Sequence, residues 1–144
     1  MHENPSNSAL KVILSEAKNI ALVGASSNRN RPSHAIMQRL QSVGYRVIPV
    51  NPNELNILGE KVYASLLDIP KDIPIDIVNV FRRSEYTLPI AQEAASIKAK
   101  TLWLQSGVYN EETALYAQHQ GLNVIMDLCI AVEYSLLIKR PLPA

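Results

Sequence analysis

The chain has 144 residues, of which 47% are hydrophobic and 19% charged, a composition typical of a single folded domain rather than a disordered or fibrous protein. Its net charge of +1 argues against an extended contact surface for duplex nucleic acid, and no apolar run approaches the roughly 20 residues of a membrane-spanning helix. The single cysteine excludes an internal disulfide and a multi-cysteine metal site. Since the first residues carry no secretory signal, we expect a cytoplasmic protein that binds neither nucleic acid nor membrane.

Apolar strands and amphipathic helices alternate along the chain. A first helix is predicted from Ser6 or Asn7 to Ala17, with apolar residues at helical spacing. Apolar runs then predict strands at 20–24, 46–51, 75–80, 101–105 and 123–126, with a short strand at 62–63. Helices are predicted at 32–43, 66–69, 84–98, 110–121 and 131–138. The alternation predicts a single α/β domain over residues 1–144, Rossmann-like and doubly wound, with a mostly parallel sheet of five or six strands.

A ligand of such a sheet binds outside the carboxyl ends of the strands, where neighbouring connections diverge to opposite faces. The segments in that position are Gly24–Ser27, Asn51–Pro52, Phe81–Arg83 and Gln105–Gly107. They supply a glycine turn, hydroxyls, an aromatic ring and arginines. The free N–H groups of a helix that begins at Pro32 would also favour an anion. Together these features indicate a nucleotide that carries phosphate.

The common dinucleotide and triphosphate motifs are absent. The stretch from Gly24 continues Ala-Ser-Ser-Asn-Arg, so the second and third glycines of G-x-G-x-x-G are missing. The second strand ends at Asn51, so no carboxylate is available there for a ribose 2′-hydroxyl. No Gly-Lys-Ser/Thr sequence of a phosphate-binding loop occurs. These departures favour a nucleotide with a phosphorylated ribose, such as coenzyme A (CoA) or NADP.

Several of these segments also carry a resemblance to a known family. They are Val23–Ser26, Arg31–Ser33, Gly44–Pro52, Gly59–Tyr63, Asp76–Arg83, Trp103–Val108 and Met126–Cys129. In this order they resemble the small, single-domain CoA-binding proteins, whose fold is similar to the CoA-binding domain of the succinyl-CoA synthetase α-subunit. The resemblance covers roughly residues 18–135. It departs at Cys129–Glu133, which lacks the proline and the basic residue that usually follow the cysteine in this family.

The resemblance implies that CoA or an acyl-CoA binds at the carboxyl edge of the sheet. The predicted cofactor-binding residues are Gly24, Ala25, Ser26, Ser27, Arg29, Arg31, Pro32, Ser33, Asn51, Pro52, Phe81, Arg82, Arg83, Gln105, Ser106 and Gly107. The loop after the first strand and the arginines would meet phosphates, and the end of the second strand would flank the adenine or its ribose. The aromatic ring would lie against the adenine or the pantetheine. The last three residues would meet the pantetheine amides.

Three further residues have a structural interpretation beside a functional one. Trp103, in the middle of a strand, is predicted to lie in the core. Asp127 is predicted to cap the last helix rather than to act as an acid or base. Cys129 is predicted to be a small buried hydrophobic residue, although an exposed thiol there could form a mixed disulfide with CoA.

The sequence thus predicts a protein that binds CoA or acyl-CoA and has no catalytic machinery of its own, with no catalytic or metal-ligating residues. Whether it is an enzyme stays open. A small NADP-dependent oxidoreductase and a nucleotide-sensing regulatory protein are the alternatives. The predicted partner is the small-molecule nucleotide. A homodimer or an unknown protein partner also stays open, as does the identity of any acyl group.

Overall fold

The computed structural model describes residues 1–138 and has a five-stranded parallel sheet at its centre, in the order β2-β1-β5-β6-β7. The strands are β1 (Asn19–Val23), β2 (Arg46–Val50), β5 (Ile77–Val80), β6 (Thr101–Leu104) and β7 (Asn123–Ile125). The helices are α1 (Asn7–Glu16), α2 (Pro32–Ser42), α3 (Thr87–Ser96), α4 (Glu111–His119) and α5 (Ile130–Leu137). The predicted doubly wound, Rossmann-like α/β fold is confirmed, and its main sheet has five strands.

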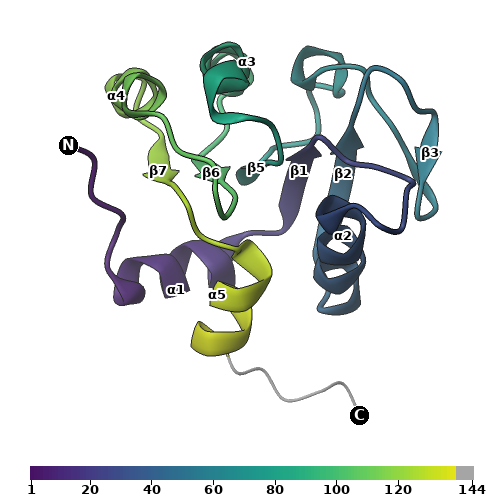
Figure 1. The fold of residues 1–144 in the computed structure, drawn as a ribbon, viewed down its shortest axis with the longest axis horizontal. Helices are drawn as coiled ribbons and strands as arrows, with labels where there is room; N and C mark the ends of the chain where they lie inside the picture. Colours follow the sequence, from purple (N-terminus) through teal and green to yellow (C-terminus); the bar gives the residue numbers. More distant parts are fainter. Residues whose placement is uncertain (139–144) are drawn as a thin grey trace.

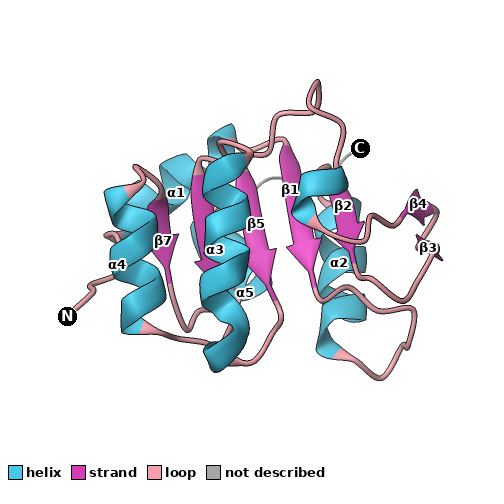
Figure 2. Ribbon diagram, turned by 90° about the horizontal axis from the view of Figure 1, so that it is seen from above, coloured by secondary structure: helices cyan, strands magenta, loops and turns pink. Residues whose placement is uncertain are grey.

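Helices cover both faces of the sheet, which is why its strands are apolar on both sides. On one face α1, α2 and α5 pack over side chains such as Leu22 and Trp103, and on the other α3 and α4 pack over Ala21 and Val78 (Figures 1 and 2). The prediction for Trp103 is confirmed, since it is fully buried. Its indole Nε1 donates to the carbonyl oxygen of Leu128 at 2.9 Å, which satisfies the polar edge of the ring.

The segment between β2 and β5 differs from the prediction. Residues 62–63 form no strand of their own: Tyr63 makes an isolated bridge to Val50. A short antiparallel hairpin, β3 (Asn56–Ile57) and β4 (Glu60–Lys61), precedes it, and a 3-10 turn, η1 (Leu66–Asp68), follows. Strands of two residues are too short to show an alternating pattern, so the sequence does not predict the hairpin.

The helix predicted at 84–98 also differs at both ends. It begins as a 3-10 turn, η2 (Ser84–Tyr86), continues as α3, and ends at Ser96. The backbone of Lys98 has a φ of 59°, and a left-handed residue of this kind terminates a helix.

The connections place the ligand-binding crevice of the fold between β1 and β5. The chain leaves β1 for α2 on one face and leaves β5 for α3 on the other, although the two strands are neighbours in the sheet (Figure 1). At such a point the two connections diverge and leave space beyond the strand ends. The carboxyl ends of β1 and β5 therefore define the place to look for a site.

At the opposite end of the sheet, the carboxylate of Asp76 ties the start of β1 to the start of β5. It accepts hydrogen bonds from the backbone N–H groups of Lys18 and Asn19 at 2.9 and 3.0 Å, and Lys100 Nζ lies 3.4 Å away. Burial of this carboxyl opposes its ionisation. The two backbone donors and the Lys100 ammonium outweigh that effect, so the pKa of Asp76 lies below its ordinary value of 3.8.

We expect Asp76→Asn to lower the free energy of unfolding at pH 7 by about 1 kcal/mol, because hydrogen bonds to a charged group are lost. Since the folded pKa is depressed, the wild-type contribution is present above pH 3.8 and disappears as the pH falls through the lower, folded value. Urea unfolding at pH 7 and at pH 3 measures both effects. Asp72→Asn, at an exposed aspartate, is the control. An equal decrease in the free energy of unfolding for Asp76→Asn and Asp72→Asn would contradict the stabilising role of the Asp76 carboxylate.

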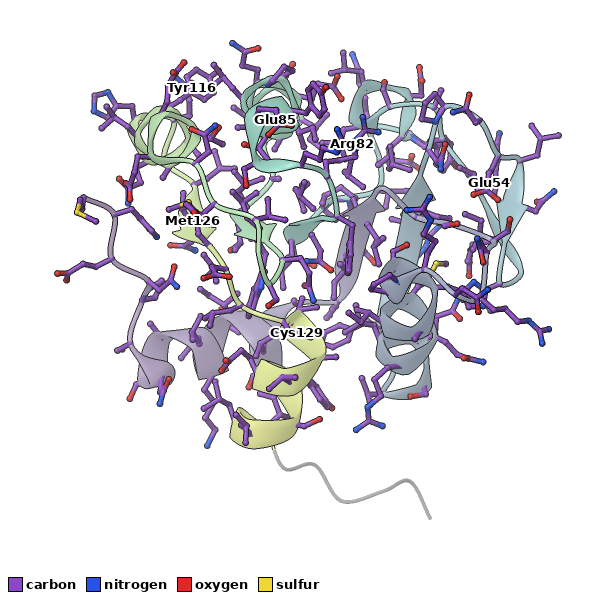
Figure 3. All side chains as sticks on the ribbon, viewed as in Figure 1. Glu54, Arg82, Glu85, Tyr116, Met126 and Cys129 are labelled. Atoms are coloured by element: carbon purple, nitrogen blue, oxygen red, sulfur yellow. The ribbon has the colours of Figure 1, made fainter. Side chains whose placement is uncertain are left out.

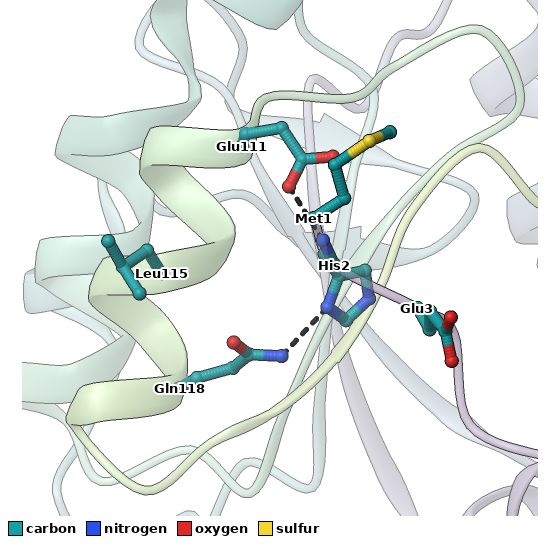
Figure 4. Close-up of a pocket in the computed structure, with 6 residues that line it drawn as sticks. All are labelled: Met1, His2, Glu3, Glu111, Leu115 and Gln118. Atoms are coloured by element: carbon teal, nitrogen blue, oxygen red, sulfur yellow. Dashed lines mark hydrogen bonds between the residues drawn. The ribbon is translucent and has the colours of Figure 1, made fainter.

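The first residues run along the outer edge of the sheet beside β7. The side-chain amide of Asn4 donates to the carbonyl oxygen of Met126 and accepts from its N–H, both at 2.8 Å. His2 lies against α4: its backbone N–H donates to Glu111 at 2.8 Å and its ring contacts Gln118 at 2.7 Å (Figure 4). These contacts hold the N-terminal segment on the domain.

Candidate ligand site

A cavity of about 580 Å³ opens at the carboxyl ends of β1, β5 and β6, where α2 and α5 begin. It is lined by Gly24, Arg31, Pro32, Ser33, Ile36, Phe81, Arg82, Arg83, Gln105, Ser106, Val108 and Cys129. We call it the switch-point cavity. Its volume lies within the range of pockets that hold small molecules. Most of the residues predicted to bind a cofactor therefore meet at one place.

Gly24, directly after β1, lies tightly against Phe81, directly after β5. It has a φ of +89°, and a Cβ built on it would lie 2.4 Å from the carbonyl oxygen of Phe81. The two segments are also bonded, since the N–H of Phe81 donates to the carbonyl oxygen of Val23 at 2.8 Å. Only glycine satisfies both the left-handed backbone and the close approach.

The N-terminus of α2 presents unpaired donors to the cavity. Arg31 occupies the N-cap without a capping side-chain bond, and Pro32 is the first helical residue. Ser33 is only 4% exposed and lines the cavity, yet neither its hydroxyl nor its N–H makes a hydrogen bond within residues 1–138. Buried polar groups normally have a partner. A ligand oxygen, and an anionic one above all, would complete this helix end.

Positive charge surrounds the same opening. Arg31, Arg82 and Arg83 are exposed and line the cavity, and no carboxylate is among the lining residues. Within the described residues the only ion pair joins Lys100 to Asp76, so the three guanidinium groups are not neutralised by acidic side chains. Arg82 also lies 6.0 Å from the centre of the Tyr86 ring, which orients it beside η2. Guanidinium groups without an acidic partner suit phosphate groups.

The cavity lining also includes uncharged side chains. Ile36, Val108 and Cys129 are among them, and Cys129 is the N-cap of α5 (Figure 3). None of the three was among the predicted site residues. Cys129 is half-buried, so the prediction of a fully buried hydrophobic residue is wrong. Its position one residue before α5 leaves one side open to the cavity.

The remaining predicted site residues lie outside the lining. They are Ala25, Ser26, Ser27, Arg29, Asn51, Pro52 and Gly107. The Ser27 N–H, which we expected to meet a phosphate, is held by both carboxylate oxygens of Glu54 at 3.1 Å. The side-chain amide of Asn51 donates to the carbonyl oxygen of Ala25 at 2.8 Å. The contacts of Ser27 and Asn51 therefore hold the loop after β1.

His34 fixes the same loop from the first turn of α2. Its Nδ1 lies 2.9 Å from the carbonyl oxygen of Ser26, and because a carbonyl only accepts, Nδ1 is the donor. The Ser26 hydroxyl in turn accepts from the N–H of Asn28 at 3.0 Å. Hydrogen bonds within the chain therefore hold this loop in its conformation.

Asp127 does not cap α5, so that prediction is wrong. Its backbone has a φ of +59°, which turns the chain between β7 and α5, and its carboxylate accepts from the N–H of Gly107 at 2.6 Å. The Asp127 N–H donates to the carbonyl oxygen of Val108 at 3.1 Å. Asp127 thus supports the segment that follows β6 and carries part of the cavity wall.

No group of three or more His, Cys, Asp or Glu side chains that could hold a metal ion occurs within residues 1–138. In the same part of the chain, every helix is too short or too polar to cross a lipid bilayer.

The order of the sheet and the position of the cavity define a Rossmann-like domain with a site at its switch point. A family model described as "CoA binding domain" matches residues 18–135, and the chain belongs to this family. The resemblance inferred from the motifs is therefore confirmed.

Three similar proteins support this assignment, two of them similar over nearly their whole length and one over a small part of its length. The uncharacterized protein YneT of Bacillus subtilis (strain 168) is 45% identical over 134 residues, which are 93% of this chain and 98% of that protein. The structure of a hypothetical protein from Pyrococcus horikoshii OT3 superposes with a TM-score of 0.89 at 34% identity, covering 96% of this chain and 99% of that one. Acetate–CoA ligase [ADP-forming] II of Archaeoglobus fulgidus is 30% identical over 105 residues, which are 72% of this chain but only 15% of the ligase.

Proposed function

We propose that the protein binds coenzyme A or an acyl-CoA in the switch-point cavity. The observation that carries the proposal is the composition of the cavity lining. It joins arginines without an acidic partner and a helix N-terminus with the unpaired Ser33 to uncharged side chains such as Phe81 and Val108. CoA combines the same two chemical characters, since its nucleotide carries phosphates and its pantetheine arm carries no charge. The family assignment and the similarity to a CoA ligase support the same ligand.

Each lining group has a task in this proposal. Ser33 and Arg31 would bind phosphate oxygens at the start of α2, where the helix dipole also favours negative charge. Arg82 and Arg83 would bind a further phosphate from the end of β5. Phe81 would lie against the adenine or the pantetheine. Asn51 would act indirectly, because it holds the loop after β1 at Ala25.

The proposal assigns binding and no reaction. In the ligases that resemble this chain, the similar region is a small part of a much longer protein, and the activity in their names belongs to those whole proteins. Within the cavity lining, Cys129 is the only nucleophilic thiol, and the lining includes no carboxylate or histidine. We therefore propose a carrier, sensor or partner subunit for CoA.

Titration calorimetry with CoA, acetyl-CoA, NADP and NAD tests the proposal directly. We expect binding of CoA or acetyl-CoA in the micromolar range or tighter, and at least about tenfold weaker binding of NAD, a difference of about 1.4 kcal/mol. Alkylation of Cys129 gives a second measurement, because a ligand in the cavity should slow the reaction of this half-buried thiol. Tight binding of NAD without binding of CoA would overturn the proposal. Tight NADP binding alone would favour the oxidoreductase alternative.

A further inference from the structure

The wall of the switch-point cavity contains a buried amide whose orientation is fixed. Gln105 lines the cavity and is only 5% exposed. Its Oε1 accepts from the N–H of Ile130 at 3.3 Å and from Nδ2 of Asn79 at 3.2 Å. Its Nε2 makes no hydrogen bond within the described residues.

Two backbone groups determine which way both amides point. The Ile130 N–H can only donate, so the Gln105 atom that faces it must be the oxygen. The Trp103 carbonyl can only accept, so the Asn79 atom 3.3 Å from it must be the nitrogen. Turning either amide over would place two donors or two acceptors against each other. The assignment of oxygen and nitrogen therefore follows from the fold.

The fixed orientation leaves a free donor at the cavity. Among the described residues, the only fully enclosed side-chain polar atom without a partner is Oδ1 of Asn79. Gln105 Nε2 also has no partner, so it must be reached by solvent, and the space beside Gln105 is the cavity. This N–H donor is therefore available to an acceptor atom of a bound molecule.

Asn79 is the positioning residue of this arrangement. It lies within β5 and is fully buried, where the other residues of the strand are apolar. It leaves its own Oδ1 unpaired. Polar residues that weaken the core in this way are expected where they serve a site. Here Asn79 Nδ2 holds the oxygen of Gln105 away from the cavity.

We infer that Gln105 Nε2 donates a hydrogen bond to a carbonyl oxygen of the ligand, either an amide carbonyl of the pantetheine arm or the thioester carbonyl of an acyl-CoA. The inference rests on the proposed CoA function and specifies which part of the ligand lies beside Gln105. Val108 and Cys129 are close to this residue, since the Val108 N–H donates to the Gln105 carbonyl oxygen at 2.8 Å and Cys129 precedes Ile130. Neither side chain is charged. The phosphates would bind the arginines.

Gln105→Glu is the sharpest test. A carboxylate keeps an acceptor for Ile130 and Asn79 but replaces the donor at the cavity by a second acceptor, which repels a carbonyl oxygen. Binding is measured by calorimetry for CoA, acetyl-CoA and adenosine 3′-phosphate 5′-diphosphate, which lacks the pantetheine arm. We expect CoA or acetyl-CoA to bind about tenfold more weakly or worse, and the truncated nucleotide to bind within about twofold of wild type.

The ligand series separates the two carbonyls. If Gln105→Glu loses equal affinity for CoA and acetyl-CoA, the acceptor is a pantetheine amide carbonyl. If only the affinity for acetyl-CoA falls, the acceptor is the thioester carbonyl. Gln92→Glu, at an exposed glutamine of α3, controls for the added negative charge. Gln105→Met, which has no amide, should also weaken the binding of CoA or acetyl-CoA, but by less than Gln105→Glu. If the glutamate variant does not fold, the methionine variant tests the inference.

Two results would overturn the inference. In the first, the Gln105 variants bind all three ligands with wild-type affinity. In the second, the variants lose as much affinity for the truncated nucleotide as they lose for CoA and acetyl-CoA. In both cases wild-type protein still binds CoA and the proposed function stands. If wild-type protein binds none of the three ligands, the proposed function fails and the inference fails with it.

Discussion

Gly24→Ala is expected to lower the free energy of unfolding by about 3 kcal/mol or more and to abolish CoA binding. The left-handed backbone costs an alanine about 1–2 kcal/mol. The new methyl group would also lie 2.4 Å from the carbonyl oxygen of Phe81, a backbone atom that cannot rotate away. The ends of β1 and β5 must then separate, and both line the cavity. Urea unfolding and calorimetry with CoA measure the two effects.

Gly121→Ala is the matched control for this substitution. Gly121 has a φ of +86°, nearly that of Gly24, but a Cβ there would meet nothing within 4 Å. Gly121→Ala should lower the free energy of unfolding by about 1–2 kcal/mol, because only the left-handed backbone is unfavourable for alanine there. It should bind CoA as wild type does. Comparable losses in both variants would show that the close approach of Gly24 to Phe81 has no energetic importance.

Replacement of Arg82 and Arg83 together by glutamine is expected to weaken CoA binding about tenfold to a hundredfold, which corresponds to about 1–3 kcal/mol for charged hydrogen bonds. Both guanidinium groups line the cavity without an acidic partner in the described part of the chain. If either binds the 3′-phosphate, dephospho-CoA should lose less affinity than CoA. Calorimetry with both ligands measures the difference.

The control for the arginine pair removes the same charge elsewhere. Arg39, in the last turn of α2, and Arg46, at the start of β2, are both exposed and lie outside the cavity lining. Their double glutamine variant should bind CoA as wild type does at 0.15 M salt, where the Debye length is about 8 Å. An equal loss in this control would mean that the overall charge of the protein, and not a local contact, governs binding.

The strands and their order of appearance could be predicted because burial on both faces makes them continuous apolar runs. Segments such as 20–24 and 101–105 have this pattern and end at a glycine or a polar residue. The hairpin of β3 and β4 could not be predicted, because its strands have two residues each and depend on the turn at Leu58 and Gly59. Local patterns carry no information at that length.

The residues of the candidate site that follow strand ends could be predicted. Those that depend on the orientation of a helix could not. The rule for parallel sheets brings Gly24, Phe81 and Gln105 to one edge whatever their conformations. Ile36 was missed because it lies about one helical turn beyond Pro32, and only the orientation of α2 shows that it faces the cavity. The helical spacing from Pro32 was the one signal that could have identified it.

The engagement of Ser27 by Glu54 was beyond sequence analysis for a different reason. The two residues lie on loops after different strands, and their contact of 3.1 Å depends on how those loops fold over β1 and β2. A hydroxyl-rich loop at a strand end is typical of an anion site, yet here a carboxylate of the same chain takes the N–H. Composition alone does not distinguish the two cases.

Each edge of the main sheet carries a contact from the chain itself. Asn4 bonds the backbone of Met126 just after β7, and Tyr63 pairs with Pro49 and Asn51 along β2. An unprotected edge would let a neighbouring molecule extend the sheet. The two contacts therefore occupy part of the backbone that an added strand would need.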